Sequence, residues 1–457
     1  MRRLIYLLVF MLVSCTPELV NPAEISPVTA IPTETDTTLC AIGQDETQTW
    51  NVRLEALTTL ANRQSICDLP ADVLLYMTYL DYGQALEAEN EIEDAIEAYQ
   101  QALSYFAEGL LAQARLDALQ SPEVTETIYT CDTEQDSELA DYQASDANFV
   151  EVEGTSLVLD NAPYPVYGVT YYPSRTPFER FLTETDLEDV AFEFELIASA
   201  GLNTARIFLR PEDLFACDAP IPNVEVFERL DSIIGLAEQN DLRLIMVLTQ
   251  DVDPSVLYFE DYLLQQLQFI VRRYQDEGAI LAWDIRDRGD TDYREGLIRQ
   301  DIAMRWFADV IIMLRRIDNH HLITLGFEQD TLVTAPLVDF VSFQFFGDYE
   351  NLRQEIANLR ASANRPILLA GTGYSTYSIS DVTQRNLLFQ TFEEVENNGL
   401  AGWVVNYAFD YPRTATCVPP DCPGAGSEIN QYGLWNTGYF PKLAVEAIRI
   451  ATGLDNE

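Results

Sequence analysis

Two acidic side chains stand where they could take part in proton transfer. Asp287 follows the apolar run Ile280–Ile285, and Glu328 follows the next apolar run along the chain. A carboxyl group at the end of a buried strand is a common general acid or base. The chain has only two histidines, His320 and His321, and no C-x-x-C spacing, which argues against a zinc site. We therefore expect no metal and no cofactor.

Aromatic and hydrogen-bonding side chains recur in the apolar runs, namely Tyr171, Tyr172, Arg206, Trp283, Gln344, Trp403 and Tyr407. Aromatic rings can stack on sugar faces, and arginine and glutamine can hydrogen-bond sugar hydroxyls. Side chains alternate along a strand, so only some of the seven can face inward. Four of them, Tyr172, Arg206, Gln344 and Trp403, are candidates for ligand binding. The alternative is that Trp283 and several of the tyrosines are core residues.

Eight short apolar runs with β-branched residues could position these side chains. The runs are Val166–Tyr171, Thr204–Leu209, Leu244–Thr249, Ile280–Ile285, Leu322–Gly326, Phe340–Phe345, Ile367–Ala370 and Gly402–Tyr407. Amphipathic stretches of helical length separate most of them, namely Leu187–Ala200, Val226–Gln239, Tyr262–Gln275, Arg299–Arg316 and Asp381–Asn397. Eight strands that alternate with helices predict an α/β fold, a (β/α)₈ TIM barrel. The fifth connection is short, so its helix is expected to be stunted or missing.

Several short motifs follow one another within residues 150–455. Gly168–Ser174 reads G-V-T-Y-Y-P-S and Ala200–Arg206 reads A-G-L-N-T-A-R. The later ones are Trp283-Asp284-Ile285, Pro366-Ile367-Leu368-Leu369, Gly402-Trp403, and Gly433-Leu434 with Pro441-Lys442. In order and spacing they resemble the clan A glycoside hydrolases, which include cellulases, mannanases and family 5 enzymes. The resemblance implies the same barrel, with its active site at the carboxyl ends of the strands.

The resemblance also implies a mechanism that needs two glutamates. One protonates the leaving oxygen and the other attacks the anomeric carbon. At the matching positions this chain has Arg288 on the fourth strand and Gly371 on the seventh. A guanidinium does not release its proton near neutral pH, and glycine has no side chain. Asp287 takes the place of the family's asparagine, and Gln344 that of a histidine on the sixth strand.

The resemblance therefore implies a barrel that has lost the family's catalysis. Arg206 and Trp403 match positions that line the family's pocket, which favours a retained sugar-binding role. Arg288 beside Asp287 is expected to form an ion pair in the former acid site. The alternative is an atypical active hydrolase of β-linked polysaccharide that uses Asp287 as a residual acid.

The first residues have the pattern of an export signal. Arg2 and Arg3 precede an apolar run, Leu4–Val13, that is too short to span a bilayer. The run leads into Ser14 and Cys15, which resembles the lipobox of bacterial lipoproteins. This implies a signal peptide over 1–14 and lipidation of Cys15, which would hold the protein on the cell surface or the extracytoplasmic face of the membrane. The alternative is an ordinary secretory signal.

Composition divides the rest of the chain. Residues 15–46 are rich in Thr, Pro, Glu and Ser and predict a flexible tether. Residues 47–120 predict helices, and the stretch 76–103 resembles one tetratricopeptide repeat, with Gly83 and Tyr99 at two of its positions. A plain helical hairpin is the alternative. A polar, acidic linker is expected over 121–148, followed by the barrel over 149–457.

Charge and cysteine content narrow the function further. Lys and Arg total 27 and Asp and Glu total 74, so the net charge is −47, which excludes nucleic acid as a partner. Apart from Cys15 there are six cysteines, an even number that predicts disulfides in an exported protein. We predict a Cys417–Cys422 pair, and by proximity Cys40–Cys67 and Cys131–Cys217.

These observations favour an exported, lipid-anchored, catalytically inactive barrel that binds carbohydrate or serves as a surface scaffold. An atypical active hydrolase is the second hypothesis. The third is an interaction protein whose helical region, residues 47–120, recruits a protein partner.

Overall fold

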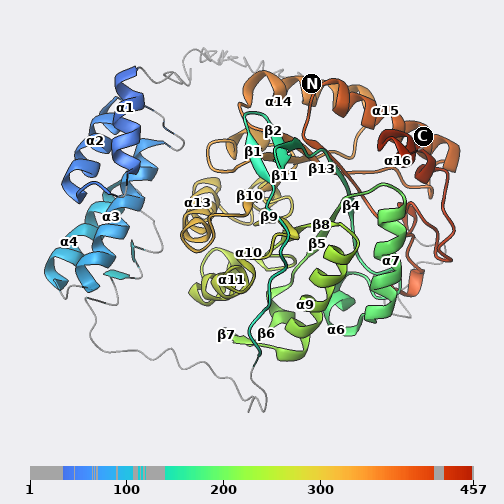
Figure 1. The fold of residues 1–457 in the computed structure, drawn as a ribbon, viewed down its shortest axis with the longest axis horizontal. Helices are drawn as coiled ribbons and strands as arrows, with labels where there is room; N and C mark the ends of the chain where they lie inside the picture. Colours follow the sequence, from blue (N-terminus) through green and yellow to red (C-terminus); the bar gives the residue numbers. More distant parts are fainter. Residues whose placement is uncertain are drawn as a thin grey trace, which may run out of the picture.

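The computed structural model has a helical region and a barrel (Figure 1). It describes residues 34–45, 47–63, 65, 67, 70–88, 91–105, 112, 113, 115, 116, 119, 139–415 and 427–454. The predicted signal peptide, Cys15 and the Cys417–Cys422 pair lie outside these residues. No described helix is long and apolar enough to cross a membrane.

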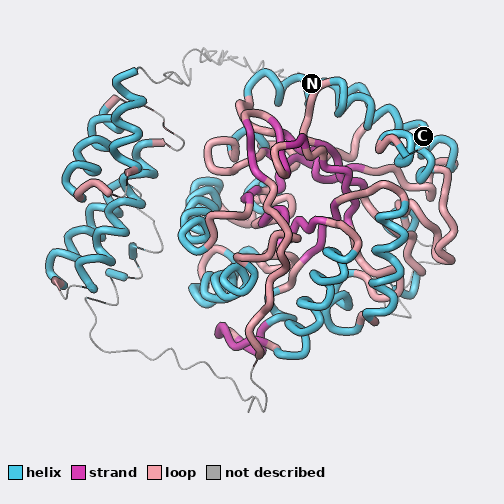
Figure 2. The backbone as a smooth tube through the Cα atoms, viewed as in Figure 1, coloured by secondary structure: helices cyan, strands magenta, loops and turns pink. Residues whose placement is uncertain are grey.

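The barrel contains all eight predicted strands. They are β4 (Val166–Thr170), β5 (Thr204–Phe208), β8 (Arg243–Val247), β9 (Ile280–Asp284), β10 (Leu322–Thr324) with β11 (Gly326–Phe327), β12 (Val341–Gln344), β13 (Ile367–Thr372) and β14 (Gly402–Val405). Every neighbouring pair is parallel, in the order β10-β9-β8-β5-β4-β14-β13-β12-β11. The fifth run is divided at Leu325 into β10 and β11, which stand at the two ends of this order. The first and last strands of the sheet therefore follow each other in the sequence, and the sheet closes on itself. The strands form a ring in Figure 2.

Helices surround this ring (Figures 1 and 2). The long ones are α7 (Leu187–Ser199), α9 (Val224–Gln239), α11 (Asp261–Tyr274), α13 (Gln300–Ile317), α14 (Tyr349–Ser362), α15 (Asp381–Asn397) and α16 (Ala444–Ala451). Short elements lie in the loops, namely η1 (Phe178–Arg180), α6 (Phe181–Glu184), α8 (Pro211–Leu214), β6 (Phe215–Cys217), β7 (Ala219–Pro222), α10 (Pro254–Leu257), α12 (Asp290–Arg294), η3 (Arg413–Ala415) and η4 (Glu428–Gln431). The fifth connection holds only the 3₁₀ turn η2 (Thr331–Val333), as its length predicts.

A small antiparallel sheet closes the amino-terminal end of the barrel. It consists of β1 (Glu151–Glu153), β2 (Ser156–Leu159) and β3 (Ala162–Pro163). Val150 and Leu157 are buried in one apolar cluster with barrel residues such as Ile245, Leu281 and Leu368. Val150 and Leu157 thus cover this end of the barrel.

The part of the predicted linker that the structure describes, from residue 139 onward, is packed on the barrel. Glu277 accepts hydrogen bonds from the Tyr142 hydroxyl at 2.8 Å and from the Ser145 hydroxyl at 2.6 Å. Arg273 donates to the carbonyl oxygen of Ala140 at 2.9 Å. These contacts fix the entry of the chain into the barrel, so the acidic composition of this segment does not make it a free linker.

The helical region contains α1 (Glu34–Gln44), α2 (Trp50–Asn62), α3 (Ala71–Ala88) and α4 (Ile92–Tyr105). At Gly83, α3 closely approaches α4, because an added Cβ atom there would stand 2.6 Å from the Tyr99 ring. Small residues thus let the two helices meet, as the repeat-like pattern requires. Assignment to the tetratricopeptide repeats stays a prediction.

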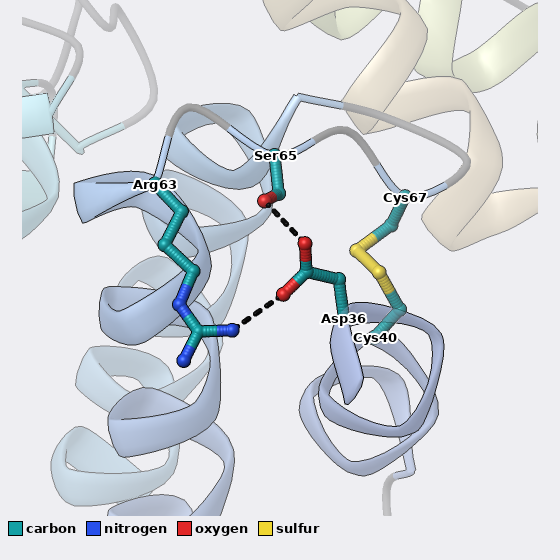
Figure 3. The surroundings of a disulfide bond; sticks show 5 residues. All are labelled: Asp36, Cys40, Arg63, Ser65 and Cys67. Carbon is teal, nitrogen blue, oxygen red and sulfur yellow. Dashed lines mark hydrogen bonds and ion pairs between the residues drawn. A yellow bond between two sulfur atoms is a disulfide. The ribbon is translucent and has the colours of Figure 1, made fainter. Parts of the chain in front are cut away.

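The flexible tether predicted over 15–46 is wrong for its last residues, because Glu34–Gln44 forms α1. Cys40 is buried with Leu54 and Leu57 of α2 in one apolar cluster. A disulfide joins Cys40 to Cys67, which confirms that predicted pair (Figure 3). Beside it, Asp36 accepts hydrogen bonds from Arg63 at 2.6 Å and Ser65 at 3.0 Å. Cys217 is also disulfide-bonded, and its predicted partner Cys131 lies outside the described residues.

The helical region lies on the side of the barrel that carries α13 (Figure 1). Ile312 of α13 is buried in the same apolar cluster as Tyr76 and Tyr99. Arg316 forms an ion pair with Asp81 at 2.7 Å and donates to the carbonyl oxygen of Met77 at 3.3 Å. The apolar cluster and the ion pair together join the two parts of the molecule.

Candidate functional site

A cavity of about 400 Å³ opens at the carboxyl ends of the barrel strands. Its walls come from strand ends and from the loops that follow them. The lining residues are Tyr172, Phe178, Arg206, Phe208, Gln250, Asp287, Arg288, Gln344, Phe346, Asn406, Tyr407, Ile429 and Tyr432. This is the end of a TIM barrel at which ligands bind. The structure therefore brings together six of the residues singled out from the sequence: Tyr172, Arg206, Asp287, Arg288, Gln344 and Tyr407.

Arg206 lies at the floor of the cavity between two carboxylates. Its side chain is 1% exposed, and it donates to Asp284 Oδ2 at 2.6 Å and to Asp287 Oδ1 at 2.6 Å. Alternation on β5 turns Arg206 inward, and alternation on β9 does the same for Asp284. Burial alone would lower the pKa of Arg206, but the charges of Asp287 and Asp284 raise it. Arg206 is therefore a fixed cation in this site.

Asp284 and Asp287 differ in what surrounds them. Asp284 is fully buried, and burial raises its pKa against the opposing effect of Arg206. It also accepts a hydrogen bond from the Gly326 amide at 3.0 Å. Asp287 is 21% exposed and is the only carboxylate among the residues that line the cavity. It is held by Arg206 and also accepts a hydrogen bond from Gln344 Nε2.

Gln344 packs against Gly371, the position at which the family resemblance would place a second carboxylate. An added Cβ at Gly371 would lie 3.0 Å from Cγ and 3.0 Å from Oε1 of Gln344. The Gln344 side chain therefore packs against the bare backbone of residue 371 and reaches across to Asp287. Gly371 has no side chain, and Gln344 fills the space that a side chain there would need.

Arg288 stands at the rim of the cavity with its side chain 52% exposed. Its Nε is 3.9 Å from Asp287 Oδ2, and its Nη1 is 3.9 Å from Glu328 Oε2. The expected ion pair with Asp287 is present, but at the limit of contact, because the short contacts of Asp287 go to Arg206 and Gln344. Arg288 is thus a solvent-exposed cation at the entrance of the cavity, and water screens its charge.

Aromatic rings form much of the remaining wall. Tyr172 and Phe208 stack with centroids 5.1 Å apart and planes 15° apart, and Arg206 lies 4.8 Å from the Phe208 ring centroid. Burial raises the pKa of Tyr172 well above its ordinary value and that of Tyr407 to about 12. Both phenol groups are therefore neutral at physiological pH. Each hydroxyl can donate a hydrogen bond, and each ring can stack on a ligand.

Three of the singled-out residues lie outside the cavity. Trp403, predicted to bind the ligand, is buried on the helix side of the barrel and stacks on Phe392 of α15 with centroids 3.9 Å apart. Trp283 donates from Nε1 to Asp318 at 2.7 Å, and Tyr171 donates to Glu193 at 2.8 Å. Alternation turns Trp403 away from the barrel interior, so the prediction for this residue is corrected.

Sequence reasoning missed several lining residues. Phe208 stands two residues after Arg206 on β5, so alternation was a signal for it. Asn406 and Tyr407 follow β14 directly, and Tyr407 was among the aromatics noted but not chosen. Tyr432 comes from a loop far along the chain, and no local pattern marks it. Within the described residues there is no cluster of His, Cys, Asp and Glu that could hold a metal ion.

No family model matches this chain. It is 22% identical over 228 residues to mannan endo-1,4-beta-mannosidase 2 of Oryza sativa subsp. japonica, a match that covers 40% of this chain. The chain spans about half the length of that curated relative, 48% of it.

Solved glycoside hydrolase structures resemble the barrel. The exo-beta-1,4-mannosidase Op5Man5 from Opitutaceae bacterium strain TAV5 has a TM-score of 0.57 at 14% identity, over 66% of this chain and 62% of its own. A GH5_18 protein from Streptomyces cattleya, in complex with GlcNAc, has a TM-score of 0.54 at 14% identity, over 63% and 79%. A GH5_18 protein from Bifidobacterium longum subsp. infantis has a TM-score of 0.53 at 15% identity, over 64% and 79%. The fold is that of these glycoside hydrolase barrels.

The site has the means to bind a polar, ring-shaped ligand. Aromatic walls, two arginines and three amide side chains surround a single carboxylate. Glycoside hydrolysis by a pair of carboxyl groups needs a second one about 5 to 10 Å away, depending on the stereochemical outcome. Among the residues that line this cavity no second carboxylate is available.

Proposed function

We propose that this chain is an exported, lipid-anchored protein whose barrel binds a carbohydrate at the cavity mouth without cleaving it. The observation that carries the proposal is that Asp287 has no second carboxylate beside it in the cavity lining. It is the one carboxylate lining the cavity, and it is tied to Arg206 and Gln344. Glycoside hydrolysis by a pair of carboxyl groups needs a second carboxyl group, and the residues that line the cavity provide only one.

The neighbours suggest which ligand to try. Two GH5_18 structures, from Streptomyces cattleya and Bifidobacterium longum subsp. longum, are described as complexes with Manb1-4GlcNAc. We therefore propose β-1,4-linked mannosides as the first ligand class. Their rings would stack on the aromatic wall, and their hydroxyls would hydrogen-bond Asn406, Gln344 and Asp287.

Calorimetric titration of the chain with mannobiose, mannotriose and Manb1-4GlcNAc tests this binding. Tyr432→Ala removes a ring of the cavity wall and should weaken binding about tenfold, or about 1.4 kcal/mol. Tyr377→Ala is the matched control, because Tyr377 is 45% exposed and does not line the cavity. Absence of binding by all three sugars, or equal binding by both variants, would contradict the proposal.

The export part of the proposal is supported by the amino-terminal pattern and by the disulfides. Disulfides persist in oxidising compartments, and both Cys40–Cys67 and the bond at Cys217 are present. In a bacterial host, the membrane fraction should retain the wild-type chain and a Thr16→Ala control. The Cys15→Ala variant should leave that fraction. Membrane retention of Cys15→Ala would refute the lipid anchor.

A further inference from the structure

Two further cavities lie between the helical region and the barrel. One measures about 680 Å³ and the other about 480 Å³, and they share Arg53, Met77, Asp81 and Arg315 in their walls. Both are within the size range of small-molecule sites. Because α2 and α3 form one side and α13 forms the other, a ligand here would touch both parts of the molecule.

The walls of these cavities are positively charged in a strongly acidic protein. Four arginines line them, namely Arg53, Arg315, Arg316 and Arg365, against two carboxylates, Asp81 and Asp339. The chain as a whole has 27 basic and 74 acidic residues. A local excess of positive charge in a polyanion of this size concentrates small anions at that point.

Arg53 is the side chain that most clearly lacks a counter-charge. It is 8% exposed, its Nε donates to the Gly43 carbonyl at 3.2 Å, and its guanidinium lies 5.1 Å from the Trp50 ring centroid. Within the described part of the chain, no carboxylate forms an ion pair with it. Asp45 is near enough only for a weak effect: hydrogen bonds from Thr47 and Gln48, and last the charge of Arg53, lower the pKa of Asp45.

Arg315 and Arg316, by contrast, already form ion pairs with carboxylates. Arg315 donates to Asp339 Oδ1 at 2.8 Å, and Arg316 pairs with Asp81. Their side chains remain 31% and 23% exposed. A buried guanidinium without a carboxylate is costly, and its planar donor set matches an oxyanion in a bidentate manner. Arg53 and Arg315, which line both cavities, provide such donors from opposite sides.

We propose that this interdomain cavity binds a small molecule through its oxyanion group, a phosphate, sulfate or carboxylate. Arg53 supplies the buried charge, Arg315 the facing charge, and Trp50 a flat apolar surface beside them. The bound anion bridges α2 and α13 and so strengthens the contact between the helical region and the barrel. This site is separate from the cavity at the barrel mouth.

Calorimetric titration of the full chain with inorganic phosphate, sulfate and galacturonate, at constant ionic strength set with chloride, tests the proposal. We expect saturable binding of at least one probe, and the three arms distinguish tetrahedral anions from a carboxylate. Arg53→Gln and Arg315→Gln should each weaken binding at least tenfold. Arg353→Gln on α14, a half-exposed arginine outside the cavity, and Tyr432→Ala at the barrel mouth should leave it unchanged.

Hydrogen exchange on the unmodified chain gives a second readout that needs no variant. The anion that binds should slow exchange in α2 and α13 and leave α15 unchanged. Three results would overturn the proposal: no saturable binding of any probe, equal binding by both cavity variants and the wild type, or no protection of α2 and α13. Failure of sugar binding at Tyr432 would not affect any of these outcomes.

Discussion

The side chain of Gln344 fills the space that a side chain at residue 371 would need. An added Cβ at Gly371 would stand 3.0 Å from two Gln344 atoms, and Gln344 Nε2 donates to Asp287. Gly371 thus leaves the end of β13 without a side chain, and Gln344 of the neighbouring strand β12 fills that space. Asp287 is the single carboxylate in the cavity lining, and a glutamate introduced at residue 371 would disturb the packing beside it.

Gly371→Glu should destabilise the protein, because the new side chain meets Gln344 in a closed space. Overpacking of this kind typically costs about 1 to 3 kcal/mol of the free energy of unfolding. Urea denaturation measures it. Gly235→Glu on α9 is the control, since a Cβ there meets nothing within 4 Å.

A double variant separates the contact with Gln344 from a general effect of the added charge on the stability of Gly371→Glu. If Gln344 is the obstacle, Gln344→Ala combined with Gly371→Glu should recover part of the lost stability. A Gly371→Glu variant as stable as the wild type, or a double variant with no recovery, would show that Gln344 does not hold that space.

Arg206→Met should be among the most damaging substitutions in the barrel. It leaves Asp284 and Asp287 without their shared cation, and breaking a buried ion pair costs about 3 to 5 kcal/mol. Arg175→Met, which breaks an exposed pair with Asp189, should cost less than about 1 kcal/mol by the same denaturation measurement.

Neutralising the two carboxylates gives the decisive comparison. Asp284→Asn and Asp287→Asn introduced together into Arg206→Met should return much of the lost stability. An Arg206→Met protein that unfolds like the wild type would mean that the ion pairs do not matter to the fold.

Much of the barrel could be predicted because apolar runs and their spacing reflect physical alternation of strands and helices. The split of the fifth strand at Leu325 and the plug formed by Val150 and Leu157 could not, since both depend on how distant strands close the barrel. The helix Glu34–Gln44 was missed because its polar composition hides Cys40, which packs against α2.

The site was predictable only where a motif or alternation pointed to it. Arg206 and Asp287 follow from their strands, and the structure brings them into contact at 2.6 Å. The prediction for Trp403 was wrong, because an aromatic residue in a strand can face either side of a barrel, and here it stacks on Phe392. Tyr432 lies in a loop, whose path depends on tertiary packing and leaves no local pattern.

Stability should rise as the pH falls from neutral toward the ordinary range of carboxyl groups, near pH 4. Burial raises the pKa of Glu193, Asp284 and Asp410 above the values of the unfolded chain. As the pH falls through these raised values, the folded state takes up protons before the unfolded state does, so the free energy of unfolding increases. Urea denaturation across this range measures the effect.

The gain should end near pH 4, where the unfolded carboxyls also protonate. Below that, stability falls again, because hydrogen bonds to Glu277 and to Asp318 outweigh burial and lower the pKa of each carboxyl, and both are then protonated. Glu193→Gln should reduce the rise between neutral pH and that point. A free energy of unfolding that is flat or falls over that interval would contradict the assignment.

Removal of the Cys40–Cys67 disulfide should weaken the helical region. The bond closes a loop with a sequence separation of 27, for which chain entropy gives about 3 to 4 kcal/mol. The double variant Cys40→Ser with Cys67→Ser should show faster hydrogen exchange in α1 and α2, with β9 unchanged as internal reference. Equal exchange in the variant and the wild type would show that packing alone holds α1.

Hydrolysis assays on β-1,4-mannan, β-glucan and manno-oligosaccharides test the central claim most directly. The wild-type chain and Asp287→Ala are assayed together for release of reducing sugar. The account predicts no release above buffer from either protein, while oligosaccharide binding by the wild type persists. Turnover by the wild type that disappears in Asp287→Ala would show that Asp287 is a working catalytic acid, and that the barrel is an active hydrolase.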